Sequence, residues 1–268
     1  MTELSPDNAN TWAQLGRYQL SAGHNEDGAK SFDRALAMPH AAVVENNAAY
    51  YLAESGYQLD RARQLILGTL EPAARRVCEP EEITKDNKCA VALTAIANWL
   101  DTAAWVIYKE GKVKESEAYA RSAWAISARP TMGAHLSLIL AVSGRIEEAL
   151  KIFSEARTRP GFDTADDLAD ARAALAKAAG ADFEARRSTK DEEANVRVVA
   201  LVEGSGKVVK AEAFDPQTPA AAVTAAKSLM LAPIAWGEHS LRSIRTVELR
   251  QDGDNWVVVR SAVGQPVN

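Results

Sequence analysis

The fold of the N-terminal part is decided by residues 12–36, which read WAQLGRYQLSAGHNEDGAKSFDRAL. Gly23 separates two stretches whose apolar residues recur at helical spacing, so the sequence predicts two helices joined by a tight turn. Small side chains let antiparallel helices approach closely, and large rings fill the space beside the contact. The residues with these roles are Gly16, Gly28, Ala35, Trp12 and Phe32.

The same pattern recurs three more times with looser spacing. Two of the later pairs share a turn of the form Gly-x-hydrophobic-x-Glu, at Gly111–Glu115 and Gly144–Glu148. Repeats that each consist of a pair of helices stack side by side and bury a continuous core. We therefore predict a mainly α chain whose residues 1–181 form a stack of helix pairs, with an insertion at 71–95. The expected bounds are 9–42, 43–72, 97–130 and 131–160 for the pairs and 164–180 for a closing amphipathic helix.

After a charged linker at residues 182–193 the apolar period changes from helical to two, which is typical of strands. Pro219 and the capping groups before it begin a helix. The order ββαββ predicts a small α+β module at 194–262, with one helix packed across a sheet. The expected elements are strands at 196–202, 208–214, 243–250 and 255–260 and a helix at 220–231.

The spacing of Trp12, Leu15 and Gly16, followed by a turn glycine and an aromatic residue, resembles the tetratricopeptide repeat. There are two departures, because Tyr18 comes one residue early and Gly28 stands where alanine is usual. The resemblance implies an α-solenoid that binds other proteins.

Three stretches are similar to bacterial envelope-associated repeat proteins, some of which carry an upstream transglutaminase-like domain. Residues 3–8 read as the end of a further repeat, so we expect the C-terminal part of a longer protein. The C-terminal module resembles TonB C-terminal domains through Gly206–Val208 and Pro233. The stretches that resemble the envelope proteins are 46–54 (NNAAYYLAE), 59–62 (LDRA) and 100–106 (LDTAAWV).

The charge and motif content argue against several function classes. A net charge of −5 and a pI near 5.5 disfavour nucleic-acid and anionic-membrane partners, which need a basic surface. No apolar stretch reaches the roughly 20 residues of a membrane-spanning helix. We expect no enzyme, no cofactor and no metal site, because nucleophile, phosphate-loop and metal-ligand spacings are missing. The histidines that lack such spacing are His24, His40, His135 and His239.

In the tetratricopeptide family, partners bind the concave face that the first helix of each pair lines. The resemblance therefore implies a protein or peptide partner and places it on one stripe of residues. Trp105 is either a binding hot spot or part of the core between repeats. The alternatives are a spacer in a larger transglutaminase-like enzyme, or a small-ligand site in the C-terminal module that uses Trp236 or His239. The stripe comprises Arg17, Leu20, Asn46, Tyr50, Asp101, Trp105, Tyr108, Lys109 and Leu138.

Cys78 and Cys89 bracket a charged segment with a proline and no apolar face. Such a segment cannot anchor itself by burial, so we expect the two cysteines to form a disulfide bond. A disulfide implies an oxidising compartment, and hence a periplasmic or secreted protein. The alternative is two reduced cysteines in a cytoplasmic scaffold.

Overall fold

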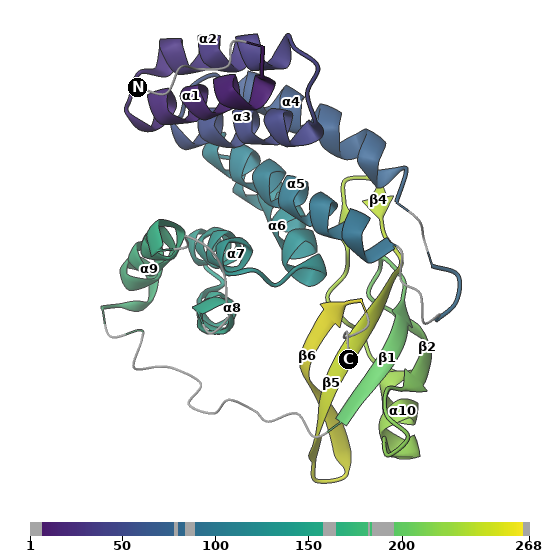
Figure 1. The fold of residues 1–268 in the computed structure, drawn as a ribbon. Coiled ribbons are helices and arrows are strands. Elements are labelled where there is room, and N and C mark those ends of the chain that lie inside the picture. The colour runs from purple at the N-terminus through teal and green to yellow at the C-terminus, as the bar shows by residue number, and fades with distance from the viewer. Residues whose placement is uncertain are drawn as a thin grey trace. The chain divides into compact units, whose positions relative to one another are not determined.

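A computed structural model gives the fold, which is mainly helical and ends in a small antiparallel sheet, as predicted (Figure 1). The chain forms two compact units, each described by itself. Unit 1 comprises Met1–Arg76 and Trp99–Ser116, and unit 2 comprises Val77–Asn98 and Glu117–Asn268. The structure describes residues 7–77, 80–83, 89–157, 165–181, 183 and 196–264, with the backbone alone at 89–91 and 165–167.

Two helix pairs stack in unit 1. Helix α1 packs on α2 and α3 on α4, and both helices of the first pair contact α3. Phe32, Leu52 and Ile66 are completely buried at these contacts. The helices are α1 (Ala9–Ser21), α2 (Asn25–Leu36), α3 (Ala42–Glu54) and α4 (Leu59–Ala74).

The first pair meets where glycine faces glycine. A Cβ atom on Gly16 would lie 2.7 Å from Cδ2 of Phe32, and one on Gly28 would lie 2.6 Å from Cγ of Leu20. Each would also lie 3.0 Å from the backbone oxygen of the other glycine. The departure from alanine at position 28 therefore has a packing reason, since no side chain fits between these two helices.

Helices α5 (Cys89–Lys109) and α6 (Val113–Ile126) cross the division between the two units. Helix α5 begins well before the predicted residue 97, and α4 continues to Ala74. The predicted insertion at 71–95 is therefore too long. The reason is that residues 89–97 read CAVALTAIA, a run with four alanines, the strongest helix formers, that continues the helix toward its N-terminus.

The helices of unit 2 are arranged around α7. Helix α7 contacts both α8 and α9, and nearly all of its residues are buried. A Cβ atom on Gly133 would lie 2.5 Å from Cβ of Ala156 and 2.7 Å from the ring of Trp124. Phe183 is buried against Phe153 of α8, with ring centroids 6.0 Å apart. The elements are α7 (Pro130–Val142), α8 (Ile146–Arg157) and α9 (Ala165–Ala179).

The C-terminal module of unit 2 has one four-stranded antiparallel sheet in the order β2-β1-β5-β6. Strand β1 pairs with β2 and with β5, with Val198 opposite Val247. Helix α10 covers one face, where Ala222 and Ala226 join the buried apolar side chains of the sheet. The elements are β1 (Val196–Val202), β2 (Val208–Ala213), α10 (Ala220–Ala226), β5 (Ser243–Asp252) and β6 (Asn255–Val263).

Two features of the module differ from the prediction. Helix α10 ends at Ala226 and not at residue 231. The carbonyl of Leu229 accepts from the N–H of Val208 and the N–H of Leu231 donates to Gly206, so this backbone pairs with the start of β2 and cannot continue the helix. The chain then forms a small hairpin of β3 (Ala235–Trp236) and β4 (His239–Ser240), which carried no sequence signal.

The segment before α5 was expected to have no apolar anchor, and this is wrong. Ile83 packs against a second apolar cluster, which is formed by Val199 and Leu201 of β1 and Ile244 of β5. Ser122 of α6 also contacts the module, because its hydroxyl donates to the carbonyl of Ala235 at 2.9 Å and accepts from its N–H at 3.0 Å.

Two predictions fall outside the residues that the structure describes. Cys78 and the side chain of Cys89 are not described, so the disulfide bond stays a prediction. The linker at residues 182–193 is described at Phe183 only, and the domain boundary there also stays a prediction.

Candidate functional site

In unit 1, the C-terminal end of α5 brings three predicted site residues together, two of them beside the carboxylate of Glu54. Trp105 donates from Nε1 to Oε2 of Glu54 at 2.7 Å. The Tyr108 ring stacks on the Trp105 ring with centroids 5.4 Å apart, and Lys109 Nζ lies 4.6 Å from the Trp105 ring centroid. Residues i, i+3 and i+4 share one face of a helix, which is why these side chains meet. Lys109 Nζ is also 3.9 Å from Oε1 of Glu54.

A second set of aromatic and basic side chains joins α1 to α3. The guanidinium of Arg17 lies over the Tyr51 ring, 5.3 Å from its centroid, and over the exposed Tyr18 ring at 5.7 Å. Tyr50 packs edge-on against Tyr51 with ring centroids 5.2 Å apart. Cation–π contacts of this kind hold the arginine side chain against the protein surface.

A hollow of about 370 Å³ opens beside Tyr51, where the C-terminal ends of α1 and α3 come together; we call it the α1–α3 hollow. Glu54 contributes a carboxylate to it. Oδ1 of Asn25 is buried there and accepts no hydrogen bond from any group that the structure describes. The lining residues are Leu20, Ser21, Gly23, Asn25, Tyr51, Glu54 and Ser55.

Besides Leu20, which lines the hollow, five of the predicted site residues lie next to it in unit 1. Arg17 is exposed, and Tyr50, Tyr108 and Lys109 are half-buried. The side chain of Asn46 is also half-buried and donates from Nδ2 to Oδ1 of Asn47 at 3.4 Å. The five residues are Arg17, Tyr50, Trp105, Tyr108 and Lys109.

Four of the predicted residues are buried, which corrects their assignment to an accessible groove. Trp105 and Leu20 are each 3% exposed, and Asp101 and Leu138 are each 7% exposed. Leu20 fills the space that Gly28 leaves open, and it reaches the hollow only as part of its lining. Leu138 belongs to α7 in unit 2, so it is not part of the unit 1 arrangement.

The sequence reasoning missed the residues that give the hollow its chemistry. Glu54 follows Tyr51 by three positions and Tyr50 by four, so helical spacing alone places it beside the predicted tyrosine. Asn25 is the first residue of α2 after a turn, and Ser55 follows the last residue of α3. The periodic spacing of side chains within a helix does not extend to such positions. The turn residues of a repeat therefore carried no usable signal.

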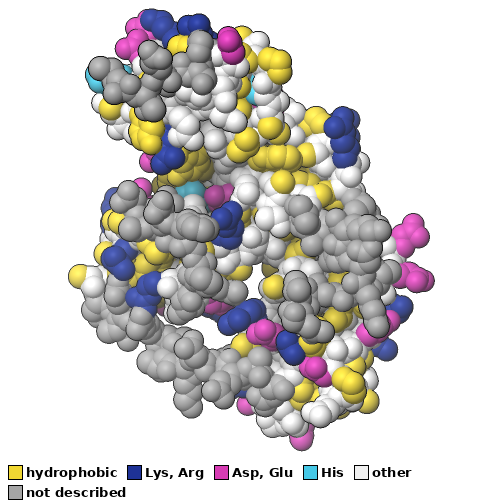
Figure 2. All heavy atoms as spheres, in the orientation of Figure 1, with side chains coloured by type: hydrophobic (Ala, Val, Ile, Leu, Met, Phe, Trp, Pro, Cys, Tyr) yellow, Lys and Arg dark blue, Asp and Glu magenta, His cyan; other side chains and the backbone are white. Residues whose placement is uncertain are grey.

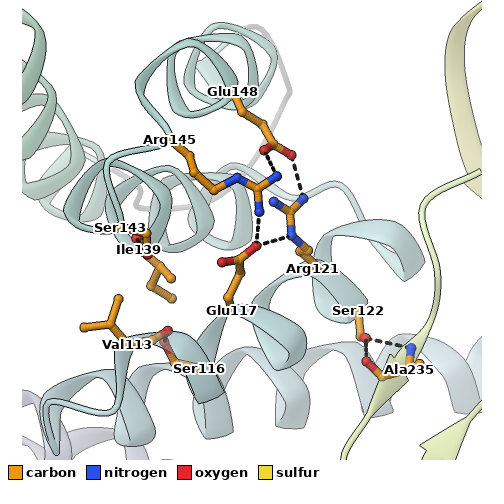
Figure 3. A network of polar contacts seen from close by, with 10 residues as sticks. All are labelled: Val113, Ser116, Glu117, Arg121, Ser122, Ile139, Ser143, Arg145, Glu148 and Ala235. Atoms are coloured by element: carbon orange, nitrogen blue, oxygen red, sulfur yellow. Dashed lines mark hydrogen bonds and ion pairs between the residues drawn. The ribbon is translucent and has the colours of Figure 1, made fainter.

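Unit 2 holds a separate network of charged residues, which Figure 3 shows. Arg121 of α6 donates from Nη1 to Glu148 and from Nε to Glu117, each at 2.7 Å, and Arg145 pairs with both carboxylates. The hydrogen bond from Arg121 holds the pKa of Glu148 below its ordinary value, although burial opposes this. Two cations and two carboxylates neutralise one another here, so the network connects α6 to the start of α8 and leaves no charge for a ligand.

The C-terminal module buries an arginine. Arg245 is 1% exposed, and it donates from Nε to Oγ of Ser243 at 3.0 Å and from Nη1 to the carbonyl of Ala232 at 2.7 Å. Burial lowers the pKa of Arg245 to about 10, so the side chain stays a cation at neutral pH. These bonds hold the backbone of the segment after α10 against β5.

The two residues of the alternative ligand site in the module contact each other. Trp236 is buried and stacks on His239 with ring centroids 5.5 Å apart. The module has a hollow of about 150 Å³, but neither of these two residues lines it. Its lining consists of Arg197, Thr246, Glu248, Arg260, Ala262, Val263 and Gly264.

Within the described part of the chain, no group of three or more His, Cys, Asp and Glu side chains could hold a metal ion. No helix among the residues with a described structure has the length and apolar character needed to cross a bilayer. On the face that Figure 2 shows, acidic and basic side chains alternate over the coloured residues. Charges of both signs placed close together compensate one another, so the coloured part of this face carries no large patch of one sign.

No protein-family model and no curated protein matches the chain. Among solved structures, the chain is similar to one from the functional characterization of Pseudomonas aeruginosa pilF. The two share 14% sequence identity, and the match covers 68% of this chain and 84% of that chain with a TM-score of 0.45. A TM-score this low carries no argument about function, which has to be inferred from the geometry of the chain itself.

Proposed function

We propose that the chain is a non-catalytic scaffold for protein–protein interaction. In this proposal its helix pairs form a tetratricopeptide α-solenoid, and unit 1 binds a peptide segment of a partner protein. The stacking of α1 and α2 on α3 and the glycine contact between α1 and α2 support the solenoid. The proposed periplasmic or secreted location depends on the predicted bond between Cys78 and Cys89.

The observation that supports peptide binding is the α1–α3 hollow together with the side chains around it. Aromatic and arginine side chains dominate the binding energy of protein interfaces. Here Tyr51 lines the hollow and Arg17 lies over its ring, while Glu54 joins the hollow to the Trp105 and Lys109 contacts. A partner segment would contact an aromatic ring, a carboxylate and two basic side chains that the fold already holds in place.

Selection from a display library of random linear peptides tests this proposal. We expect purified chain to enrich a family of peptides that bind with micromolar dissociation constants in fluorescence anisotropy. Tyr51→Ala and Arg17→Ala should each weaken binding by about tenfold, the loss expected for an interface contact worth about 1.4 kcal/mol. Circular dichroism checks that both variants keep the helical fold.

The matched control truncates an exposed apolar side chain in the other unit. Met230→Ala should leave the dissociation constants unchanged, because Met230 is exposed on the C-terminal module. If no peptide is enriched, or if the enriched peptides bind the Tyr51→Ala and Arg17→Ala variants as well as the native chain, unit 1 is not a peptide-binding site.

A further inference from the structure

We propose that the α1–α3 hollow takes a cationic side chain, arginine or lysine, of the bound segment. This inference rests on the proposed function and adds to it the chemistry of the anchoring residue. The partner would insert an ammonium or guanidinium group beside Glu54 and Asn25, with its aliphatic stem along Tyr51. The lining supplies acceptors for such a group and an aromatic surface for its stem.

Two side chains of the hollow offer oxygen acceptors to a ligand. Oδ1 of Asn25 is buried and accepts no hydrogen bond from the described residues, and a buried acceptor left in this state destabilises the fold. The Glu54 side chain is 42% exposed and its Oε1 lies 3.9 Å from Lys109 Nζ, beyond hydrogen-bond distance, so this oxygen is open to a donor from a ligand. A ligand with several N–H donors would bind Oε1 of Glu54 directly, and Oδ1 of Asn25 once that side chain turns toward the hollow.

The helix ends add to this preference for a cation. Helices α1 and α3 both end at the hollow, and the C-terminal end of a helix carries a partial negative charge. Neither helix has a basic residue in its last turn to neutralise that charge. Helix α2 begins at the hollow with the opposite partial charge, but Glu26 and Asp27 in its first turn offset it.

Two basic side chains stand close to the hollow without filling it. Lys109 is held over the Trp105 ring and Arg17 over the Tyr51 and Tyr18 rings, so the negative faces of the rings compensate part of both charges. A volume of about 370 Å³ corresponds to roughly twelve water molecules, which leaves room for one more cationic side chain.

The test uses small probes and the full chain. Amide chemical shifts of Gly23 and Ser55 would be followed by NMR during titration with the N-acetyl amides of arginine, lysine and citrulline at constant ionic strength. Citrulline has the shape of arginine without its charge. We expect saturable shifts with arginine and lysine and an affinity for citrulline at least tenfold lower. Whichever cation binds more tightly identifies the anchoring residue.

Glu54→Gln supplies the matched variant. Glutamine keeps an oxygen that can accept from Trp105 Nε1, so the fold is retained while the charge is removed. Arginine binding should fall at least tenfold in this variant and stay unchanged in Glu147→Gln, which alters an exposed carboxylate of α8. Equal affinities for arginine and citrulline, or for the native chain and Glu54→Gln, would overturn the inference.

The outcome separates this inference from the proposed function. Library peptides that depend on Tyr51 but carry no enriched arginine or lysine, and that bind Glu54→Gln as well as the native chain, leave the scaffold in place and refute the cationic anchor. Failure to select any peptide refutes the scaffold itself. Enrichment of one basic position, together with loss of binding in Glu54→Gln, supports both.

Discussion

At the scale of single residues, two glycines of unit 1 should respond in opposite ways to the same substitution. Gly16→Ala places a Cβ atom 2.7 Å from the fully buried Phe32 ring, and overpacking of this kind costs about 1–3 kcal/mol. Alanine regains about 1 kcal/mol of helix propensity. The free energy of unfolding should therefore fall by up to about 2 kcal/mol, measured by urea denaturation.

Gly68→Ala is the control, because Gly68 lies within α4 and a Cβ atom there would have no atom within 4 Å apart from its chain neighbours and the backbone of its own helix. Only the propensity gain applies, so this variant should be more stable by about 0.5–1 kcal/mol. Equal effects of the two substitutions would mean that the glycine contact between α1 and α2 is not tight.

The sequence was least informative about the burial and the contacts of single residues in the site. Helical spacing correctly brought Trp105, Tyr108 and Lys109 together, since they belong to one turn of one helix. It could not show that Trp105 is buried, because burial depends on what packs across from the helix. The hydrogen bond between Trp105 and Glu54 joins residues 51 positions apart in the chain. Long-range contacts of this kind leave no local pattern.

At the scale of elements, the network between α6 and α8 makes the stability of unit 2 depend on pH. The Arg121 hydrogen bond keeps the pKa of Glu148 below the ordinary value for glutamate, about 4.3. The contribution of Glu148 is therefore complete above about pH 4.3 and is lost as the pH falls through its lower folded-state pKa. The loss should be at most about 1 kcal/mol, because the charged side chains of the network are partly exposed.

Urea denaturation of the native chain and Glu148→Gln at pH 7 and pH 3 measures this effect. The difference between the two proteins at pH 7 should become smaller at pH 3, while Glu147→Gln follows the native chain throughout. A constant difference between native chain and Glu148→Gln at both pH values would show that ionisation of Glu148 contributes nothing.

Elements themselves were largely predictable, and the exceptions have physical causes. Long amphipathic stretches predicted the helices because the apolar face of each one repeats several times. The hairpin of β3 and β4 has two residues in each strand, too few for any period to be seen. The end of α10 was misplaced because Leu229 and Leu231 are good helix formers, but their backbone hydrogen bonds go to Val208 and Gly206.

At the scale of the whole molecule, we expect one unfolding transition. Helices α5 and α6 each contribute residues to both units. Unfolding of one unit would therefore break a helix that continues in the other unit. Differential scanning calorimetry should give a single peak whose midpoint falls in Gly16→Ala, where only unit 1 is altered. Two peaks, of which this substitution moves only one, would show that the units unfold independently.

The packing of Ile83 on the C-terminal sheet has a consequence for synthesis on the ribosome. Ile83 leaves the ribosome about 160 residues before Ile244, the last member of the cluster against which it packs. At a synthesis rate of about 5–20 residues per second, the wait is on the order of 10–30 seconds. During that time an isoleucine between two finished helices has no place to dock. Ile83 therefore remains accessible to chaperones and proteases until the final strands of the protein have been made.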